Sequence, residues 1–432
     1  MILHPPHESN RTSWLWAGLW AVFIYSTIPL APALRMYVDD AVGRIWFAYL
    51  VIAVVLVGGL FAAGKLWKGI RRIQWMSMIL LVSIGSVYIV WTLHLAKESA
   101  EEAIPFLLYG VLAFLLFRAF SHGVRDVTIY AAIAITGAIV GTVDEIIQWF
   151  VPDRYFDFRD VRLNFASCLL TLATIGLCFR PVYIVRKIAP RSYLRLLGLG
   201  TILWVLILFC RVNTPALQAS YSSLLPAFSD FLNPDEVMTE FGYQYLDPDI
   251  GSFKSRLYPN ELKAQDRERA AEAGKVLDAF HRPDSYQAFL SEYASTKDAF
   301  LHEARVHLFR RDRYRRRLAA AEDREAADAY AIIAYRENLI MERYFPHTMA
   351  NTIFRLRRDT ASSLQEAQDP DAPYRSPVSN HVVTRLTIQQ VIFRMLAIEA
   401  GWILACSGLY LVAASRLRGK SIAGAESGAL SE

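Results

Sequence analysis

The segment of about residues 211–390 contains no cysteine, no tryptophan and no long uncharged apolar run. The lack of cysteine excludes disulfides within it, and the lack of an apolar run excludes a membrane span, which needs about 20 apolar residues. Charged residues recur every few positions instead: residues 214–390 hold 23 Lys or Arg and 26 Asp or Glu, a net charge of −3. We therefore expect one water-exposed domain here.

The rest of the chain is strongly apolar. Of its 432 residues, 54% are hydrophobic and 20% are charged, which is too apolar for a soluble protein and too charged for one wholly embedded in a membrane. The sequence predicts an all-α, polytopic membrane bundle of about eight transmembrane helices, at residues 14–34, 45–64, 74–95, 104–120, 129–151, 163–185, 194–210 and 391–414. We expect the cysteines in or beside these runs to be small packing residues: Cys168, Cys178, Cys210 and Cys406.

The Lys and Arg residues of the short loops predict the orientation. With a cytoplasmic N-terminus, 15 of them lie in inside loops and six in outside loops. The first apolar run is then a retained signal anchor, with a cleaved signal peptide as the alternative. The expected order is a six-helix membrane domain (1–190), a seventh span (191–211), a mostly helical extracytoplasmic domain (212–390), an eighth span (391–415) and a cytoplasmic tail (416–432).

One stretch, GTVDEIIQWFVPDRYFDFRDVRLNF at residues 141–165, interrupts the apolar pattern. An ionisable side chain at membrane depth costs roughly 2.5 to 3.5 kcal/mol, so that such residues are rarely kept without a role. Glu145 and Gln148 lie three residues apart and thus on one face of the fifth helix. The candidate site is this polar cluster: Asp144, Glu145, Gln148, Arg154, Asp157, Arg159, Asp160 and Asn164.

The pattern D-E-I-I-Q-x-F-x-P-x-R-x-x-D-x-R-D-V-x-x-N of residues 144–164, with YGVLAFLLF upstream, resembles the signature of VanZ-like membrane proteins. The resemblance covers about residues 97–177. It implies a bacterial inner-membrane protein, and a link to resistance against teicoplanin-type glycopeptides, whose target is an outer-face cell-wall precursor. The family-like polar positions are Glu145, Gln148, Arg154, Asp160 and Asn164. The chain departs from the family at Pro105, Asp153 and Ser167, where the family often has His, Gly and Gly.

Two interpretations of the polar cluster stay open. The first is structural: a buried network of ion pairs and hydrogen bonds locks the fifth and sixth helices together, with Glu145 in salt-bridge range of Arg154 or Arg159. The second is functional, in which the carboxylates and arginines hold an anionic lipid headgroup or perform acid–base chemistry. The stretch carries no accompanying nucleophile, metal triad or phosphate loop, and we expect no cofactor and no metal.

The water-exposed domain contains a run with six arginines in eight residues, RRDRYRRR. Its predicted place outside the cell excludes nucleic acid and leaves anionic headgroups, acidic polysaccharide or acidic protein as partners. The alternative is a solvated helix whose arginines pair with nearby acids. The candidate surface comprises Arg310, Arg311, Arg313, Arg315, Arg316 and Arg317.

Two further features are a pair of histidines in the water-exposed domain and a glutamate within a predicted membrane span. LHEARVHLF is similar to a zinc-protease H-E-x-x-H motif, but His302 and His307 are five apart and lie about 140° from each other around a helix, which excludes one shared ion. Glu399, in the predicted eighth helix, needs a polar partner, and we expect Arg211 at the outer end of the seventh; the alternative is a Glu399 that is protonated in the bilayer.

We expect a non-enzymatic envelope protein that recognises a partner or a lipid-linked ligand, such as a cell-wall precursor or a glycopeptide, at the outer membrane face. One alternative is an accessory subunit of a larger membrane protein complex, with the water-exposed domain as its docking module. Another is an enzyme that acts on a lipid-linked substrate through Glu145 and Asp160. Membrane lipids are partners in all three.

Overall fold

The computed structural model describes residues 7–41, 45–67, 74–98, 103–151, 154–224 and 237–429. The chain divides into two compact units. Unit 1 comprises residues 1–210 and 393–432, and unit 2 comprises residues 211–392. Unit 1 holds the apolar helices, and unit 2 holds the charged segment.

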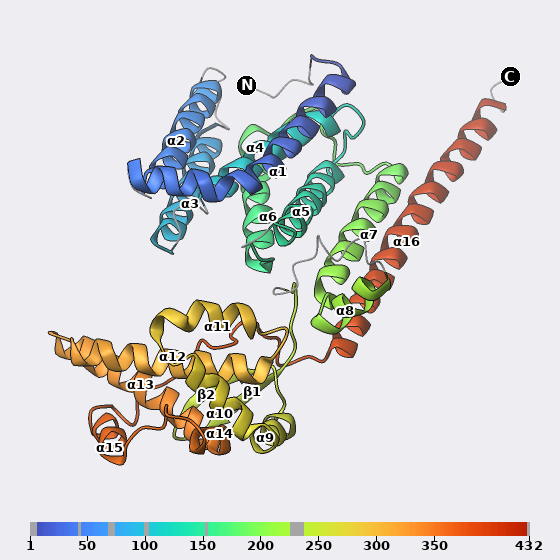
Figure 1. Cartoon of the computed structure of the whole chain (residues 1–432). Helices are drawn as coiled ribbons and strands as arrows, with labels where there is room; N and C mark the ends of the chain where they lie inside the picture. The colour runs from blue at the N-terminus through green and yellow to red at the C-terminus, as the bar shows by residue number, and fades with distance from the viewer. Residues whose placement is uncertain are drawn as a thin grey trace. The chain divides into compact units, whose positions relative to one another are not determined.

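Each predicted apolar run coincides with a helix (Figure 1). In chain order these are α1 Asn10–Ala41, α2 Ile45–Trp67, α3 Gln74–Glu98, α4 Ala103–Phe120, α5 Thr128–Trp149, α6 Phe158–Ala173, α7 Pro190–Val212 and α16 Ile388–Ala429. Helix α6 continues as a π-helical turn, Thr174–Phe179.

Among the described residues, six helices are long and apolar enough to cross a membrane: Asn10–Leu30, Trp75–Leu95, Thr128–Trp149, Phe158–Phe179, Pro190–Val212 and Ile388–Arg416. Two further apolar stretches are Val51–Gly64, within α2, and Ile104–Phe120, within α4. These helices indicate a membrane protein. The count of eight spans stays a prediction.

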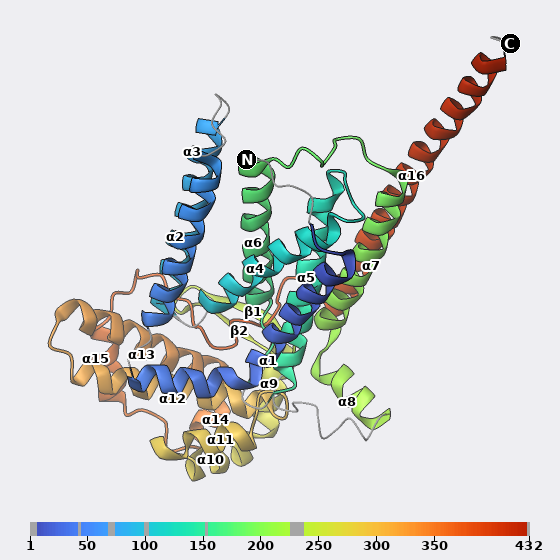
Figure 2. The same ribbon diagram turned by 90° about the horizontal axis from the view of Figure 1, so that it is seen from above.

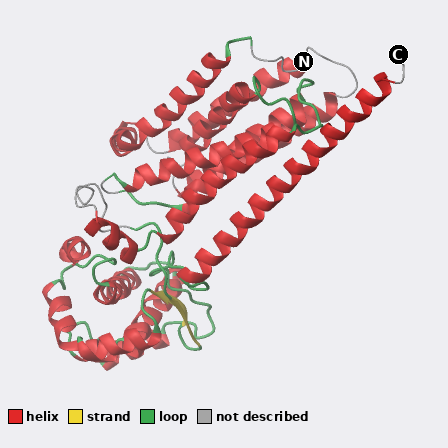
Figure 3. Cartoon of the chain, turned by 90° about the vertical axis from the view of Figure 1, so that its right-hand side faces the viewer, coloured by secondary structure: helices red, strands yellow, loops and turns green. Residues whose placement is uncertain are grey.

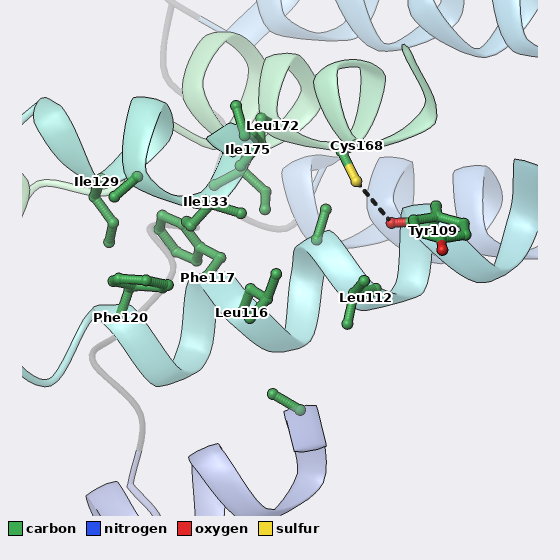
Figure 4. Packing of buried hydrophobic residues seen from close by; sticks show 14 of the residues in the cluster. Tyr109, Leu112, Leu116, Phe117, Phe120, Ile129, Ile133, Cys168, Leu172 and Ile175 are labelled. Atoms are coloured by element: carbon green, nitrogen blue, oxygen red, sulfur yellow. Dashed lines mark hydrogen bonds between the residues drawn. The ribbon is translucent and has the colours of Figure 1, made fainter. Parts of the chain in front are cut away.

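The main core of unit 1 lies between α1, α4, α5 and α6. Leu112 and Phe117 of α4 pack with Ile133 of α5 and Leu172 of α6, and each of the four is at most 5% exposed (Figure 4). Lipid tails are as apolar as these side chains, so van der Waals packing rather than escape from water stabilises the contact.

Two glycines of α5, four residues apart, permit α6 to approach closely. A Cβ atom on Gly137 would lie 2.7 Å from Sγ of Cys168, and one on Gly141 would lie 3.3 Å from Cβ of Asn164. The thiol of Cys168 donates to the carbonyl oxygen of Tyr109 in α4 at 3.4 Å (Figure 4). The contact of α5 with α6 therefore depends on small residues at these two positions.

Helices α7 and α16 run side by side (Figures 1 and 2). The indole nitrogen of Trp402 in α16 lies 3.4 Å from the carbonyl oxygen of Leu197 in α7 and donates to it. A Cβ atom on Gly200 would lie 2.1 Å from the same nitrogen, so a residue larger than glycine forces the two helices to shift.

The predicted pair of Glu399 with Arg211 is wrong. Oε1 of Glu399 accepts a hydrogen bond from Thr201 at 2.6 Å, and Oε2 has no hydrogen-bond partner among the described residues. Arg211 lies ten residues beyond Thr201, which is about 15 Å along a helix. Glu399 of α16 therefore lies level with Thr201 of α7 and not with the end of α7, where Arg211 lies.

Unit 2 combines helices with one β-hairpin, which is coloured yellow in Figure 3. Its elements are α8 Pro215–Leu224, β1 Tyr243–Asp247, β2 Gly251–Ser255, α9 Pro259–Glu268, α10 Ala270–Ala279, a 3-10 turn Pro283–Ser285, α11 Tyr286–Glu292, α12 Ala299–Ala319, α13 Arg324–Tyr344, α14 Pro346–Ala350 and α15 Arg358–Glu366. Helices α12 and α13 pack against each other.

The hairpin corrects the expectation of an all-α chain. Strands β1 and β2 are antiparallel, and the rings of the paired residues Tyr245 and Phe253 stack with centroids 4.6 Å apart. Gly251 has a φ of +101°, and a Cβ atom there would lie 2.1 Å from the carbonyl oxygen of Tyr374. This turn needs glycine for both reasons. Two strands of five residues are too short to stand out in a helix-rich pattern.

A buried ionic network holds the segment that precedes α16 against the rest of unit 2. The carboxylate of Glu240 accepts from Nε of Arg256 at 2.6 Å and from Nε2 of His381 at 2.6 Å. Arg256 also pairs with Glu303 of α12 at 3.2 Å. Burial alone raises the pKa of Glu240, but the hydrogen bonds from His381 and Arg256 outweigh it and lower the pKa to about 2.

A second network centres on Glu337 of α13, which is 0% exposed. Its Oε2 accepts from Nδ1 of His307 at 2.5 Å, and its Oε1 accepts from Nε of Arg310 at 2.9 Å. The same Oε1 accepts from the hydroxyls of Tyr374 at 2.7 Å and Ser376 at 2.9 Å. Burial raises the pKa of Glu337, but His307 and Arg310 together bring it below its ordinary value.

Candidate functional site

The polar cluster lies where α5 ends and α6 begins. Its most buried members, at most 8% exposed, are Asp144, Glu145, Gln148 and Asn164. Partly buried members are Arg154, Asp157, Arg159 and Asp160. The eight predicted residues thus occupy two packed helices and the loop that joins them.

Gln148 joins the helix to the loop. Its amide nitrogen donates to Oε1 of Glu145 at 2.7 Å, and its amide oxygen accepts from Arg154. Oε2 of Glu145 accepts from the backbone nitrogen of Asp157 at 3.2 Å. Oε2 of Glu145 therefore fastens the loop to α5, and Oε1 orients Gln148, which binds Arg154 of the loop. A direct ion pair of Glu145 with Arg154 or Arg159 stays a prediction.

Asp157 caps the N-terminus of α6. Its Oδ1 accepts from the backbone nitrogen of Arg159 at 2.7 Å, and Asp160 follows in the first turn. Carboxylates at these positions complement the positive end of the helix dipole. The helix has the acidic start that the sequence predicts, and it begins at Phe158 rather than at residue 163.

Two buried polar atoms of this region have no hydrogen-bond partner among the described residues: Oδ1 of Asp144 and the hydroxyl of Tyr109. Tyr109 is fully buried on α4, and its hydroxyl lies beside the Asp144 carboxylate and interacts with it, so that the two groups face one common position. An unsatisfied buried polar atom costs about 1–3 kcal/mol, so that it marks a position for a water molecule or a ligand.

Sequence reasoning did not place Tyr109 in the polar cluster. Only the packing of α4 against α5 brings it beside Asp144, which lies 35 positions later in the chain. The available signal was its position as the first residue of the family-like segment YGVLAFLLF.

The formal charge of the polar cluster is negative, because four carboxylates face two guanidinium groups. With every group ionised the net charge is −2 for Asp144, Glu145, Asp157, Asp160, Arg154 and Arg159. Burial disfavours the charged form of a carboxyl group, so this count is the upper limit of the negative charge, and the carboxyl oxygens suit a hydrogen-donating group better than a second anion.

A serine and a histidine also meet in unit 1. Oγ of Ser13 lies 2.9 Å from Nε2 of His122 and donates to Oε1 of Glu8 at 2.6 Å. In a catalytic triad the carboxylate orients the imidazole. Here Glu8 accepts the hydrogen bond of the serine hydroxyl instead of orienting His122, and it pairs with Arg118 at 2.7 Å. This contact ties the start of α1 to the end of α4 and does not activate the serine.

The arginine run does not form one continuous surface. Arg311 is 1% exposed and donates to Asp312 at 2.9 Å, while Arg310 donates to the buried Glu337. Arg311 also donates to Oδ1 of Asn338 at 3.2 Å, so both arginines hold α12 and α13 together. The assignment of the buried Arg311 to a partner surface is wrong, and that of the partly buried Arg310 stays a prediction. Of the other predicted residues, Arg315 is partly buried, and the exposed ones are Arg313, Arg316 and Arg317.

The two histidines of LHEARVHLF bind different groups. Nδ1 of His302 lies 3.0 Å from the carbonyl oxygen of Tyr293, whereas His307 binds Glu337. Within the described ranges, no group of three or more His, Cys, Asp or Glu side chains is arranged to hold a metal ion.

The family model described as VanZ/LLP1 matches residues 45–179 of the chain. The match begins well before residue 97, where the resemblance in the sequence starts, and it includes Tyr109 and the whole polar cluster. No curated protein and no solved structure matches the chain. Residues 45–179 are therefore similar to the VanZ/LLP1 family, as the sequence pattern predicts.

Proposed function

We propose that the chain is a VanZ-like integral membrane protein of the bacterial cell envelope that recognises the polar head of a lipid-linked ligand without transforming it. The polar cluster supplies the binding groups at the outer membrane face. Unit 2 lies outside the cytoplasm, between two membrane spans, and adds specificity. The charge bias of 15 to six Lys and Arg residues over the loops supports this orientation.

The observation that carries the proposal is the pair of unpartnered buried atoms, Oδ1 of Asp144 and the hydroxyl of Tyr109. A purely structural cluster is expected to satisfy its own buried polar atoms. Glu145 does so, because both of its oxygens accept hydrogen bonds from neighbouring groups. The same contacts argue against Glu145 as a catalytic base, which needs a free oxygen within reach of a substrate proton.

Native mass spectrometry of the full chain, extracted in mild detergent, tests the proposal. A lipid-linked molecule should co-purify with the wild-type chain and fall at least fivefold in Asp144→Asn and in Tyr109→Phe. Glu399→Gln is the matched control, because Glu399 is a carboxylate of a predicted span outside the polar cluster. Equal retention of the same molecules in all of these variants would refute ligand recognition by the cluster.

A second candidate, an accessory subunit of a membrane complex, is favoured by one feature of α16. Leu396, Leu404 and Leu411 are 55%, 73% and 65% exposed. This apolar surface suits lipid or a helix of another subunit. A stoichiometric protein partner that co-purifies with the wild-type chain and is lost when these leucines are replaced by larger residues would favour the subunit.

A further inference from the structure

We infer that the ligand head carries a primary ammonium group, which Asp144 and Tyr109 receive. This inference rests on the proposed function and names the chemical class of the ligand for the same site.

Charge is the first argument. The polar cluster has four carboxyl groups and two guanidinium groups, so an anionic head would lie among more acidic than basic side chains. Not every carboxylate of the polar cluster is available to a ligand. Glu145 is occupied by Gln148 and the loop backbone, and Asp157 caps α6. Asp144, at 5% exposure, retains an oxygen with no hydrogen-bond partner among the described residues.

Hydrogen bonding is the second argument, and it adds the Tyr109 hydroxyl, which lies beside Asp144. The Tyr109 hydroxyl comes from a different helix, is fully buried, and also lacks a partner in the described part of the chain. A primary ammonium has three N–H donors and no acceptor. It can donate to Oδ1 of Asp144 and to the hydroxyl oxygen of Tyr109 at the same time. A quaternary ammonium has the same charge but no N–H group, so it leaves both oxygens unsatisfied.

Arg154 is placed to bind the phosphate of a lipid head that carries both a phosphate and an ammonium group. It donates to Gln148, which also binds Glu145, and its positive charge acts on Asp144. A phosphate next to the ammonium would therefore lie on the loop side of the site, where this guanidinium favours it. An amino lipid without phosphate would contact only Asp144 and Tyr109.

The test compares lipids that differ in one feature. Delipidated full chain in a non-ionic detergent is titrated with phosphatidylethanolamine, phosphatidylcholine and phosphatidylglycerol of identical acyl chains, and with dodecylamine, and binding is measured by native mass spectrometry. Phosphatidylethanolamine should bind at least tenfold more tightly than phosphatidylcholine, because methylation removes the N–H donors and keeps the charge. Dodecylamine should compete with it if the ammonium alone suffices. If dodecylamine fails to compete, the phosphate contributes as well.

Variants complete the test. Asp144→Asn and Tyr109→Phe should each abolish the preference for phosphatidylethanolamine over phosphatidylcholine, and Glu399→Gln should keep it. Cluster-dependent binding of all three phospholipids with no such preference overturns the ammonium assignment and leaves lipid recognition standing. Absence of binding by both amine probes also overturns it, and water then accounts for the two unpartnered atoms. The co-purification experiment decides recognition of a lipid-linked ligand separately.

Discussion

The substitution Glu337→Gln probes the more deeply buried of the two networks in unit 2. Glu337 accepts four hydrogen bonds while fully buried, and two of its donors, His307 and Arg310, lie on the neighbouring helix α12. Glutamine keeps the shape but removes the charge and turns an NH₂ group toward donors. Breaking a buried pair from one side costs about 3–5 kcal/mol. In a unit of this size each kcal/mol lowers the melting temperature by about 2–4 °C, so the expected loss is on the order of 10 °C.

The chain offers a way to attribute this loss to unit 2. All ten tryptophans lie outside residues 211–392, so tryptophan fluorescence reports on unit 1 alone, whereas circular dichroism reports on the helices of both units. Glu337→Gln should lower the dichroism transition and leave the fluorescence transition nearly in place. Glu322→Gln, at an exposed position beyond α12, is the matched control. A Glu337→Gln transition within about 2 °C of wild type would contradict the stated role of the network.

Three further predictions follow from the contacts. The folded pKa of Glu240, about 2, lies below its ordinary 4.5, so its contribution of about 3 kcal/mol to the free energy of unfolding is present above pH 4.5 and is lost as pH falls toward 2. Acid unfolding followed by circular dichroism should show this loss, and Glu240→Gln should remove that part of the pH dependence; an unchanged profile in the variant would disprove the assignment. Gly200→Ala should destabilise the contact of α7 with α16 by about 1–3 kcal/mol, because the new Cβ atom meets Trp402 at 2.1 Å. Gly198→Ala is its control, with no atom within 4 Å, and equal melting temperatures in detergent would count against this packing. A cysteine at Leu246, which is 75% exposed, should react with an impermeant maleimide in intact spheroplasts, since the native cysteines are buried; labelling only after lysis would place unit 2 in the cytoplasm.

The apolar helices were predictable because their signal is local. A run of some 20 apolar residues forms a helix in lipid whatever its neighbours are, since every backbone polar group must be satisfied within the segment. The predicted runs agree with the helices of unit 1 to within a few residues at most ends. Helix α16 ends at Ala429, beyond the predicted end at residue 414, and α6 starts five residues before the predicted run because Asp157 caps it. A capping contact depends on local conformation rather than on hydropathy.

The hairpin and the buried arginines were not predictable in this way. Five-residue strands are set by pairing between segments, so that the stacking of Tyr245 on Phe253 cannot be inferred from a short alternating pattern. Arg311 belongs to a visibly basic run, yet the packing of α12 against α13 buries it. Composition shows how many charges a helix carries. Which of them face solvent is decided by the neighbouring helix.

The same distinction explains why Tyr109 is the most informative position of the polar cluster. The charged members were found because ionisable residues are conspicuous in an apolar run, whereas a tyrosine is not. Tyr109→Phe removes one oxygen that has no hydrogen-bond partner among the described residues and changes no formal charge. If the cluster only locks α5 to α6, this deletion should be neutral or slightly stabilising, because it relieves an unsatisfied buried polar atom. If the cluster receives a ligand, the same variant should keep its melting temperature when delipidated and lose bound lipid. A drop in the melting temperature of the delipidated protein, with lipid retained, would assign the hydroxyl a structural role.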